Sequence, residues 1–243
     1  MAIHQEEPTP AEGFGRILIS SRSLDEYRAM FELTDGDLRR RILDCPSGAA
    51  EFTAEICRLG GDAIACDSAY FDNGIDKVAA TAVAEAERGN RYVHANRHLY
   101  RWTFFADPDQ HRIQRQRAAE RFVAHTRQSR GRYVAGRLPA LPFPDNDFDL
   151  VLSSHLLFSY AEELDYDFHL HALLELMRVT RGELRVFPLV SIGTTARYPH
   201  LNELLVQLRR YGIAGRITEV DYEFQVGGNE MLVCRRLEGM PTY

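Results

Sequence analysis

The sequence contains almost no lysine, few cysteines and no long hydrophobic run. Only Lys77 among its 29 basic residues is lysine, a bias that reflects genome composition rather than function. The four cysteines show no paired spacing, which argues against a CxxC metal site and a disulfide scaffold. No apolar segment approaches the roughly 18 residues that span a membrane. We therefore expect a cytoplasmic protein with no bound metal and no membrane partner.

The length of 243 residues, 45% of them hydrophobic and 26% charged, is enough for one globular core. The opening MAIHQEEPTPAEGFG is acidic and rich in proline and glycine, so we expect a short lead-in and no signal peptide. A net charge of −6 gives no overall attraction to nucleic acid, which makes a nucleic-acid partner unlikely. Whether the chain forms a homo-oligomer stays open.

Strand and helix patterns alternate along most of the chain. Residues 1–40 are expected to form the lead-in and a first helix, and residues 41–243 the main domain. The strands are expected at about 42–44, 63–67, 133–135, 148–153, 184–190, 217–224 and 231–235. The last two are joined too closely for a parallel crossover. We predict an α/β fold, with a doubly wound, mostly parallel seven-stranded sheet and an antiparallel C-terminal hairpin.

Local signals mark where several helices begin and end. Ser23 with Glu26 three residues later predicts a capping box, and Gly36 a stop. A helical insertion is expected at about 75–130, with breaks near Gly89-Asn90 and Asp107-Pro108. A crossover normally needs only a dozen or more residues, so the insertion is expected to cover one end of the sheet.

Two acids follow consecutive predicted strands. Asp44 precedes the loop Cys45–Gly48, and Asp67 comes 23 residues after Asp44, where a ribose diol finds its acceptor. The alternative is a plain strand–turn–helix, with Asp44 capping and Asp67 solvated. Because the loop has a single glycine and Glu51 follows it, a pyrophosphate is disfavoured. The pattern favours a cationic, phosphate-free nucleoside over NAD or FAD.

Three segments carry a resemblance to a known family. ILDCPSGAAEF, AIACD and LPALPFPDNDFDLVLSSHLLF resemble the glycine-loop, ribose-acid and fourth-strand motifs of class I S-adenosylmethionine-dependent methyltransferases, and the likeness spans about Arg41 to Arg236. It implies a Rossmann-like transferase with S-adenosylmethionine as its cofactor. It also implies cofactor-binding roles for Asp44, Cys45, Pro46, Ser47 and Gly48 at the methionine end, Phe52 beside them, Asp67 at the ribose, Arg137 and Leu138 at the adenine, and Ser153, Ser154 and His155 at the methyl donor.

The sequence departs from the family pattern in two places. The loop has fewer glycines, and Arg137 stands where many members have an acid for the adenine amino group. An arginine cannot accept a hydrogen bond, so backbone groups must recognise the adenine, or Arg137 faces elsewhere. A non-catalytic binding subunit that keeps the fold therefore stays an alternative, and an NAD-dependent oxidoreductase a weaker one.

The methyl acceptor is expected to be a small or medium organic molecule. Residues 88–130 carry ten arginines and four histidines against three acids, which favours an anionic or carbonyl-rich acceptor, although a solvated basic face explains the same excess. Tyr100 and Trp102 are candidates for a pocket wall, or for docking the insertion. Tyr160, Asp165 and His169 are assigned to a substrate rim, with helix capping by Asp167 as the alternative for that stretch.

His155 follows the fourth predicted strand and is the candidate catalytic residue. It is either a general base, which its ordinary pKa of about 6.5 suits, or a wall of the cofactor pocket. Methyl transfer is largely a matter of positioning in a closed cleft, so no catalytic triad is required.

Overall fold

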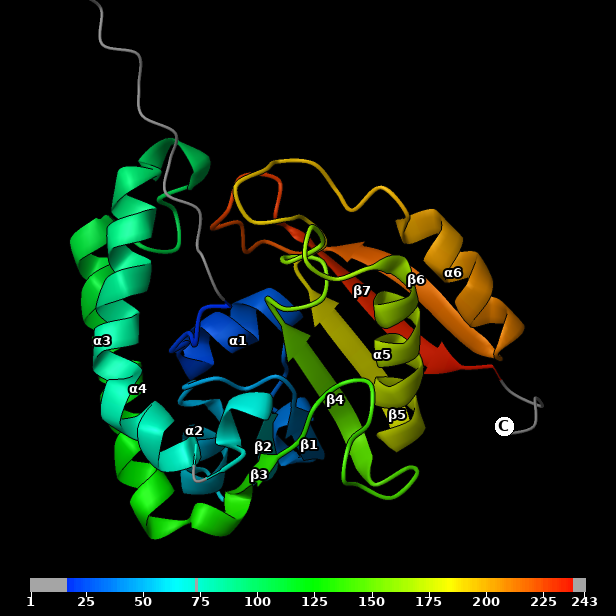
Figure 1. Cartoon of the computed structure of the whole chain (residues 1–243), viewed down its shortest axis with the longest axis horizontal. Coiled ribbons are helices and arrows are strands. Elements are labelled where there is room, and N and C mark those ends of the chain that lie inside the picture. Colours follow the sequence, from blue (N-terminus) through cyan, green and yellow to red (C-terminus); the bar gives the residue numbers. More distant parts are fainter. Residues whose placement is uncertain (1–16, 73, 238–243) are drawn as a thin grey trace, which may run out of the picture.

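A computed structural model describes residues 17–72 and 74–237, and the expected lead-in over residues 1–15 lies outside them. It contains one seven-stranded sheet in the order β3-β2-β1-β4-β5-β7-β6 (Figure 1). Strand β7 runs antiparallel to both of its neighbours, and the other pairs are parallel. The strands are β1 (Arg41–Asp44), β2 (Asp62–Asp67), β3 (Tyr133–Ala135), β4 (Phe148–Ser154), β5 (Thr180–Phe187), β6 (Ile213–Glu219) and β7 (Glu230–Arg236). The predicted fold is confirmed.

Helices cover both faces of this sheet (Figure 1). They are α1 (Leu24–Phe31), α2 (Phe52–Arg58), α3 (Gly74–Ala95), α4 (Pro108–Gln128), α5 (Tyr166–Val179) and α6 (Leu201–Arg210). The long helices α3 and α4 pack against each other and form the predicted insertion between β2 and β3.

Alternation along the strands divides the core between the two faces. In β1, Leu43 points to a cluster with α5 and α6, whereas Ile42 points to a cluster with α1 and α2. A third cluster joins α3 and α4 to β2 and β3. Each helical layer is therefore anchored by apolar burial, the dominant favourable term in folding.

Several predicted boundaries are wrong. β5 begins at Thr180 and ends at Phe187, and β6 covers Ile213–Glu219 rather than 217–224. Helix α3 continues through Gly89-Asn90, and Gly89 faces the side chain of Leu18 and leaves room for it. The stop of α1 is Glu32, in the left-handed conformation, rather than Gly36.

The capping box of α1 is only half formed. Ser23 Oγ accepts a hydrogen bond from the Glu26 amide at 3.2 Å, as predicted. The Glu26 carboxylate does not reach back, because it binds Arg115 of α4 instead. Among the helices of residues 17–72 and 74–237, none has the length and apolar character to cross a membrane.

Candidate active site

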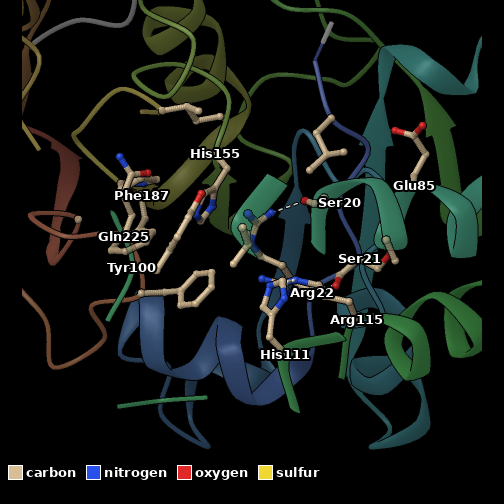
Figure 2. A pocket seen from close by; sticks show the side chains of 18 of the residues that line it. Ser20, Ser21, Arg22, Glu85, Tyr100, His111, Arg115, His155, Phe187 and Gln225 are labelled. Carbon is tan, nitrogen blue, oxygen red and sulfur yellow. Dashed lines mark hydrogen bonds between the residues drawn. The ribbon is translucent and has the colours of Figure 1, made fainter. Parts of the chain in front are cut away.

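A cleft opens where the ends of β4 and β5 meet the insertion and the β6–β7 connection. Its cavity volume is about 80 Å³, and its empty space is about 800 Å³ when the solvent at the open mouth is counted. Figure 2 shows its polar side chains converging from distant parts of the chain. The lining residues come from five segments: Leu18, Ser20, Ser21 and Arg22; Glu85, Ala86, Gly89, Val93 and Tyr100; His111 and Arg115; His155, Tyr160, Phe187, Pro188 and Ile192; Tyr222, Phe224, Gln225 and Gly228.

Asp44 lies at the end of β1, beside this cleft but outside its lining. It is fully buried, and the hydroxyl of Tyr27 in α1 donates to its carboxylate, 3.0 Å from either oxygen. Burial raises the pKa of Asp44 to about 7. A cation placed next to it would favour its ionised form.

Asp67, at the end of β2, organises the neighbouring loop. Its two carboxylate oxygens accept hydrogen bonds from the amides of Gly48 and Ala69, both at 2.8 Å. The residue is half-buried, and burial raises its pKa. Because a carboxylate has about four lone-pair sites, Asp67 keeps acceptor capacity for a further donor such as a ribose hydroxyl.

A strap of residues 18–22 crosses the loop after β1. The carbonyls of Ser20 and Arg22 accept from the amides of Ala49 and Glu51 at 3.0 and 3.1 Å. Gly48 has a φ of 57°, and a Cβ there would lie 3.0 Å from the Ser20 carbonyl oxygen. The predicted glycine is therefore needed both for its backbone conformation and for the approach of the strap.

A buried cluster of charges forms one wall of the cleft. Arg115 of α4 binds both carboxylate oxygens of Glu26 in α1, with Nη2 2.6 Å from Oε1. Tyr222 donates to the same carboxylate at 2.7 Å. Burial alone would raise the pKa of Glu26, but Arg115 and Arg22 lower it overall.

Arg22 places a second positive charge next to the Glu26 carboxylate. Its Nη1 donates to Ser20 Oγ, and its Nε lies 3.6 Å from Glu26 Oε1. That Nε is buried and has no hydrogen-bond partner among the described residues. In Figure 2 the Arg22 guanidinium lies between Ser20 and His155.

The two histidines of the cleft are held neutral. His111 Nε2 accepts from Arg115 Nε at 3.2 Å, so the proton is on Nδ1, which donates to Asn90 Oδ1 at 3.0 Å. Burial and the adjacent guanidinium groups lower the pKa of His111 to about 2. The same causes lower the pKa of His155 well below its ordinary value.

His155 has an unusual backbone conformation. Its φ is 51°, a left-handed value that is uncommon for a residue with a Cβ and that clusters at functional sites. Its ring lies 5.6 Å from that of Phe187, and its Nδ1 is buried without a partner in the described chain. The imidazole thus borders the cleft as a neutral group.

The predicted substrate residues separate into two groups. Tyr100 and Tyr160 line the cleft, and the Tyr160 hydroxyl accepts from the Leu18 amide at 2.9 Å. Trp102 is not among the lining residues, because it packs edge-on against Phe224 in the core. Its role is docking the insertion.

Asp165 and His169 do not line the cleft, contrary to their predicted place at a substrate rim. Asp165, not Asp167, caps α5 by accepting from the Phe168 amide at 2.8 Å. The His169 ring is fully buried, and its nitrogens lie 2.6 and 2.9 Å from the carbonyls of Asp165 and Leu157. Neither residue lines the cleft, since both are used to fix the start of α5.

The remaining predicted cofactor residues lie at the strand ends. Arg137 is exposed after β3, with its guanidinium 5.9 Å from the ring centre of Phe71. Phe52 stacks on Tyr27 at 4.6 Å, behind Asp44. The other members are buried or half-buried at the ends of β1, β3 and β4: Cys45, Pro46, Ser47, Leu138, Ser153 and Ser154.

The arginines of the insertion are largely paired. Arg115, Arg121 and Arg130 bind acids outside residues 88–130, namely Glu26, Glu51 and Asp76. The arginine excess of residues 88–130 is therefore partly neutralised by acids from other parts of the fold. The charge excess at the cleft comes from Arg22, which lies outside the insertion and was not predicted. The one sequence feature that could have drawn attention to Arg22 was its position next to the Ser23 capping box.

Comparison with known proteins agrees with the topology. A family model described as "Methyltransferase domain" matches residues 106–183, which include α4, β3, β4 and α5 but not the loop after β1. In the sheet β7 alone runs antiparallel, at the position expected for that family. Residues 106–183 thus match a methyltransferase domain, and the whole chain has the fold of class I S-adenosylmethionine-dependent methyltransferases.

This methyltransferase has relatives of low similarity. An uncharacterized protein of Methanocaldococcus jannaschii is 29% identical over 222 residues, which cover 90% of this chain and 96% of the relative. A TehB-like S-adenosylmethionine-dependent methyltransferase from Corynebacterium glutamicum is similar in structure, with 19% identity, coverage of 87% and 86%, and a TM-score of 0.47.

A second solved structure is the Burkholderia thailandensis 1,6-didemethyltoxoflavin-N1-methyltransferase with bound 1,6-didemethyltoxoflavin and S-adenosylhomocysteine. It is 16% identical, covers 88% of this chain and 79% of its own, and has a TM-score of 0.46. These values are too low to transfer a substrate or a residue role to the methyltransferase.

The residues at the ends of β1 and β2 fit S-adenosylmethionine. Asp67 has spare acceptor sites for the ribose diol. Asp44, whose pKa is about 7, suits the ammonium group of the methionine end, because a neighbouring cation stabilises its ionised form. Both residues would thus hold the cofactor beside the cleft.

Proposed function

We propose that this methyltransferase transfers a methyl group from S-adenosylmethionine to a small anionic organic acceptor held in the cleft. The observation that supports this proposal is the charge balance at the cleft wall. The lining residues Arg22 and Arg115 face the single carboxylate of Glu26 behind them, and the one acid among the lining residues, Glu85, is bound by Arg88 at 2.8 Å. One positive charge is left over, which an anionic acceptor would neutralise.

The surroundings of Arg22 strengthen its interaction with an anion. It lies among aromatic and aliphatic side chains, where the effective dielectric constant is well below that of water. Its Nε has no partner in the described residues, so a bound carboxylate or similar group would satisfy a donor that is otherwise unpaired. The hydrogen bond from Arg22 to Ser20 Oγ holds the Arg22 guanidinium in place before the acceptor binds.

When bound, S-adenosylmethionine supplies an electrophilic methyl group on a sulfonium centre. The protein's contribution is to position the acceptor and exclude water from it. Tyr100, Phe187 and Phe224 provide apolar walls for the body of the acceptor. The enclosed shape favours a small molecule over a nucleic-acid strand.

The test uses the full-length protein, radiolabelled S-adenosylmethionine and a small-molecule filtrate of the source organism. The filtrate is first separated by anion exchange into retained and unretained fractions. We expect label to enter compounds of the retained, anionic fraction. Labelling confined to the unretained fraction, or no labelling of either, would contradict the proposal.

The matched variants are Arg22→Gln and Arg117→Gln, the second on an exposed position of α4. Loss of a charge-assisted hydrogen bond costs about 1.5–3 kcal/mol, so Arg22→Gln should raise the KM for the retained fraction roughly tenfold or more. Arg117→Gln should leave it unchanged.

A further inference from the structure

We infer that the acceptor atom is a carboxylate oxygen, so that the product is a methyl ester and no group of the protein removes a proton. This inference rests on the proposed function and specifies the reaction at the same cleft. It follows from an inventory of every group in the cleft wall that could accept a proton. Each of these groups is either already bound or surrounded by positive charge.

His155 is the nearest candidate base. It is half-buried after β4, against Phe187, and the Arg22 guanidinium lies next to it in the cleft, with Arg115 on the same side (Figure 2). Protonation would place a third positive charge beside two guanidinium groups that share one carboxylate. The lowered pKa of His155 agrees with that arrangement.

His111 has no free lone pair. Its Nε2 accepts from Arg115, and its Nδ1–H donates to Asn90. The ring is also stacked 5.0 Å from Phe224 and is almost fully buried. It fixes the position of Arg115 and cannot take a proton from an acceptor.

The carboxylates are equally engaged. Glu26 is bound by Arg115 through both oxygens and by Tyr222, and Glu85 is bound by Arg88. Asp44 does not line the cleft, and its carboxylate already accepts from Tyr27. No carboxylate in the described wall is thus presented as a base.

The tyrosines of the cleft do not fill this role either. Tyr222 donates its hydroxyl hydrogen to Glu26, and Tyr160 accepts from Leu18. Burial raises the pKa of both hydroxyls and that of Tyr100, so all three stay neutral at neutral pH.

An acceptor in this cleft must therefore be nucleophilic as it arrives. Carboxyl groups lose their proton at a pH of about 4, whereas thiols, phenols and ammonium groups lose theirs at about 8.5 to 10.4. Of these groups only the carboxyl is fully deprotonated at neutral pH, and its negative charge also neutralises the charge excess at Arg22. The guanidinium can hold one carboxylate oxygen and leave the other free.

The step balances without proton transfer. A lone pair of the carboxylate oxygen forms the new O–C bond, while the S–C bond breaks and leaves its electron pair on sulfur. The anion and the sulfonium cation are both consumed, and a neutral ester and a neutral thioether remain. Any proton-dependent step would need a base that the described wall does not offer.

The experiment treats the labelled products of the anion-exchange fraction with mild alkali and measures volatile labelled methanol. Methyl esters release their label, whereas ethers, thioethers and methylamines keep it. We expect most of the label to be released. Alkali-stable label in the anionic fraction would overturn this inference and leave the proposed function standing, and an absence of labelling would overturn both.

A pH series gives an independent readout. The transfer rate at saturating cofactor should change less than twofold between pH 6.5 and 8.5, because neither the acceptor nor a lining residue titrates there and the cation of the bound cofactor keeps Asp44 ionised. His155→Asn, which suits the left-handed backbone, should give a profile of the same flat shape, whatever its absolute rate. A wild-type rate that rises about tenfold per pH unit, as for an un-ionised acceptor, or a profile that only His155→Asn alters, would contradict the inference.

Discussion

The two halves of the site are built in different ways. At the cofactor end, Asp44, Gly48 and Asp67 follow consecutive parallel strands, and backbone amides hold Asp67 in place. The acceptor cleft instead joins the strap, α1, α4 and the β6–β7 connection through side chains that are far apart in sequence, with Arg115 bound to Glu26 across 89 positions. The cofactor end is thus fixed by local topology, and the cleft by tertiary packing.

The largest effect is expected from breaking the ion pair that holds the cleft together. Glu26→Gln leaves two guanidinium groups buried without a counter-charge, which should lower the free energy of unfolding by about 3–5 kcal/mol. Denaturant unfolding of this variant is compared with Glu87→Gln on an exposed position of α3, expected within about 0.5 kcal/mol of wild type. Equal losses of unfolding free energy in Glu26→Gln and Glu87→Gln would mean that the charge cluster does not stabilise the cleft.

The neutral histidine of the cleft predicts a pH dependence opposite in sign to that of the cofactor end, where burial raises the pKa of Asp44. The pKa of His111 is about 2 in the folded protein and about 6.5 in the unfolded chain. The unfolded chain therefore binds this proton first, and the contribution of His111 to the free energy of unfolding falls as the pH drops below about 6.5, by about 1.4 kcal/mol per pH unit.

His111→Gln should remove that part of the slope between pH 6 and 5, while His171→Gln, on an exposed position of α5, serves as the control. Urea unfolding at each pH measures the slope. A slope that is the same in wild type and in His111→Gln would show that His111 is not held neutral.

Gly48 lies in the loop at the cofactor end and Gly89 lines the cleft, and a side chain would meet different neighbours at each. Gly48→Ala forces a side chain into a left-handed backbone conformation, 3.0 Å from a carbonyl oxygen, and should cost about 1–2 kcal/mol of stability.

Gly89→Ala meets only the flexible end of Leu18, also at 3.0 Å. The gain in helix propensity of up to about 1 kcal/mol should offset this crowding, so the net change is expected to be close to zero. Thermal unfolding of both variants shows which substitution lowers the stability more. A larger loss of stability in Gly89→Ala than in Gly48→Ala would contradict the prediction.

The same contrast explains what could be predicted from the sequence. The mostly parallel sheet with its antiparallel C-terminal hairpin and the positions of Asp44, Gly48 and Asp67 at strand ends could be predicted, because strand periodicity and parallel topology place strand ends at one edge. The cleft could not, because nothing local to Arg22 or Glu26 indicates that they meet α4. Asp165 and His169 looked like rim residues from spacing alone, but their side chains satisfy backbone groups at the start of α5.

The central claim is that the strand-end acids hold the cofactor, and calorimetric titration with S-adenosylhomocysteine tests it most directly. We expect one molecule to bind per chain, and Asp67→Ala to weaken the affinity roughly tenfold to a hundredfold, the loss of a charge-assisted hydrogen bond worth about 1.5–3 kcal/mol. Asp145→Ala, at an exposed position before β4, should bind like wild type. No heat of binding at high micromolar ligand, or an unchanged dissociation constant in a folded Asp67→Ala variant, would contradict the account.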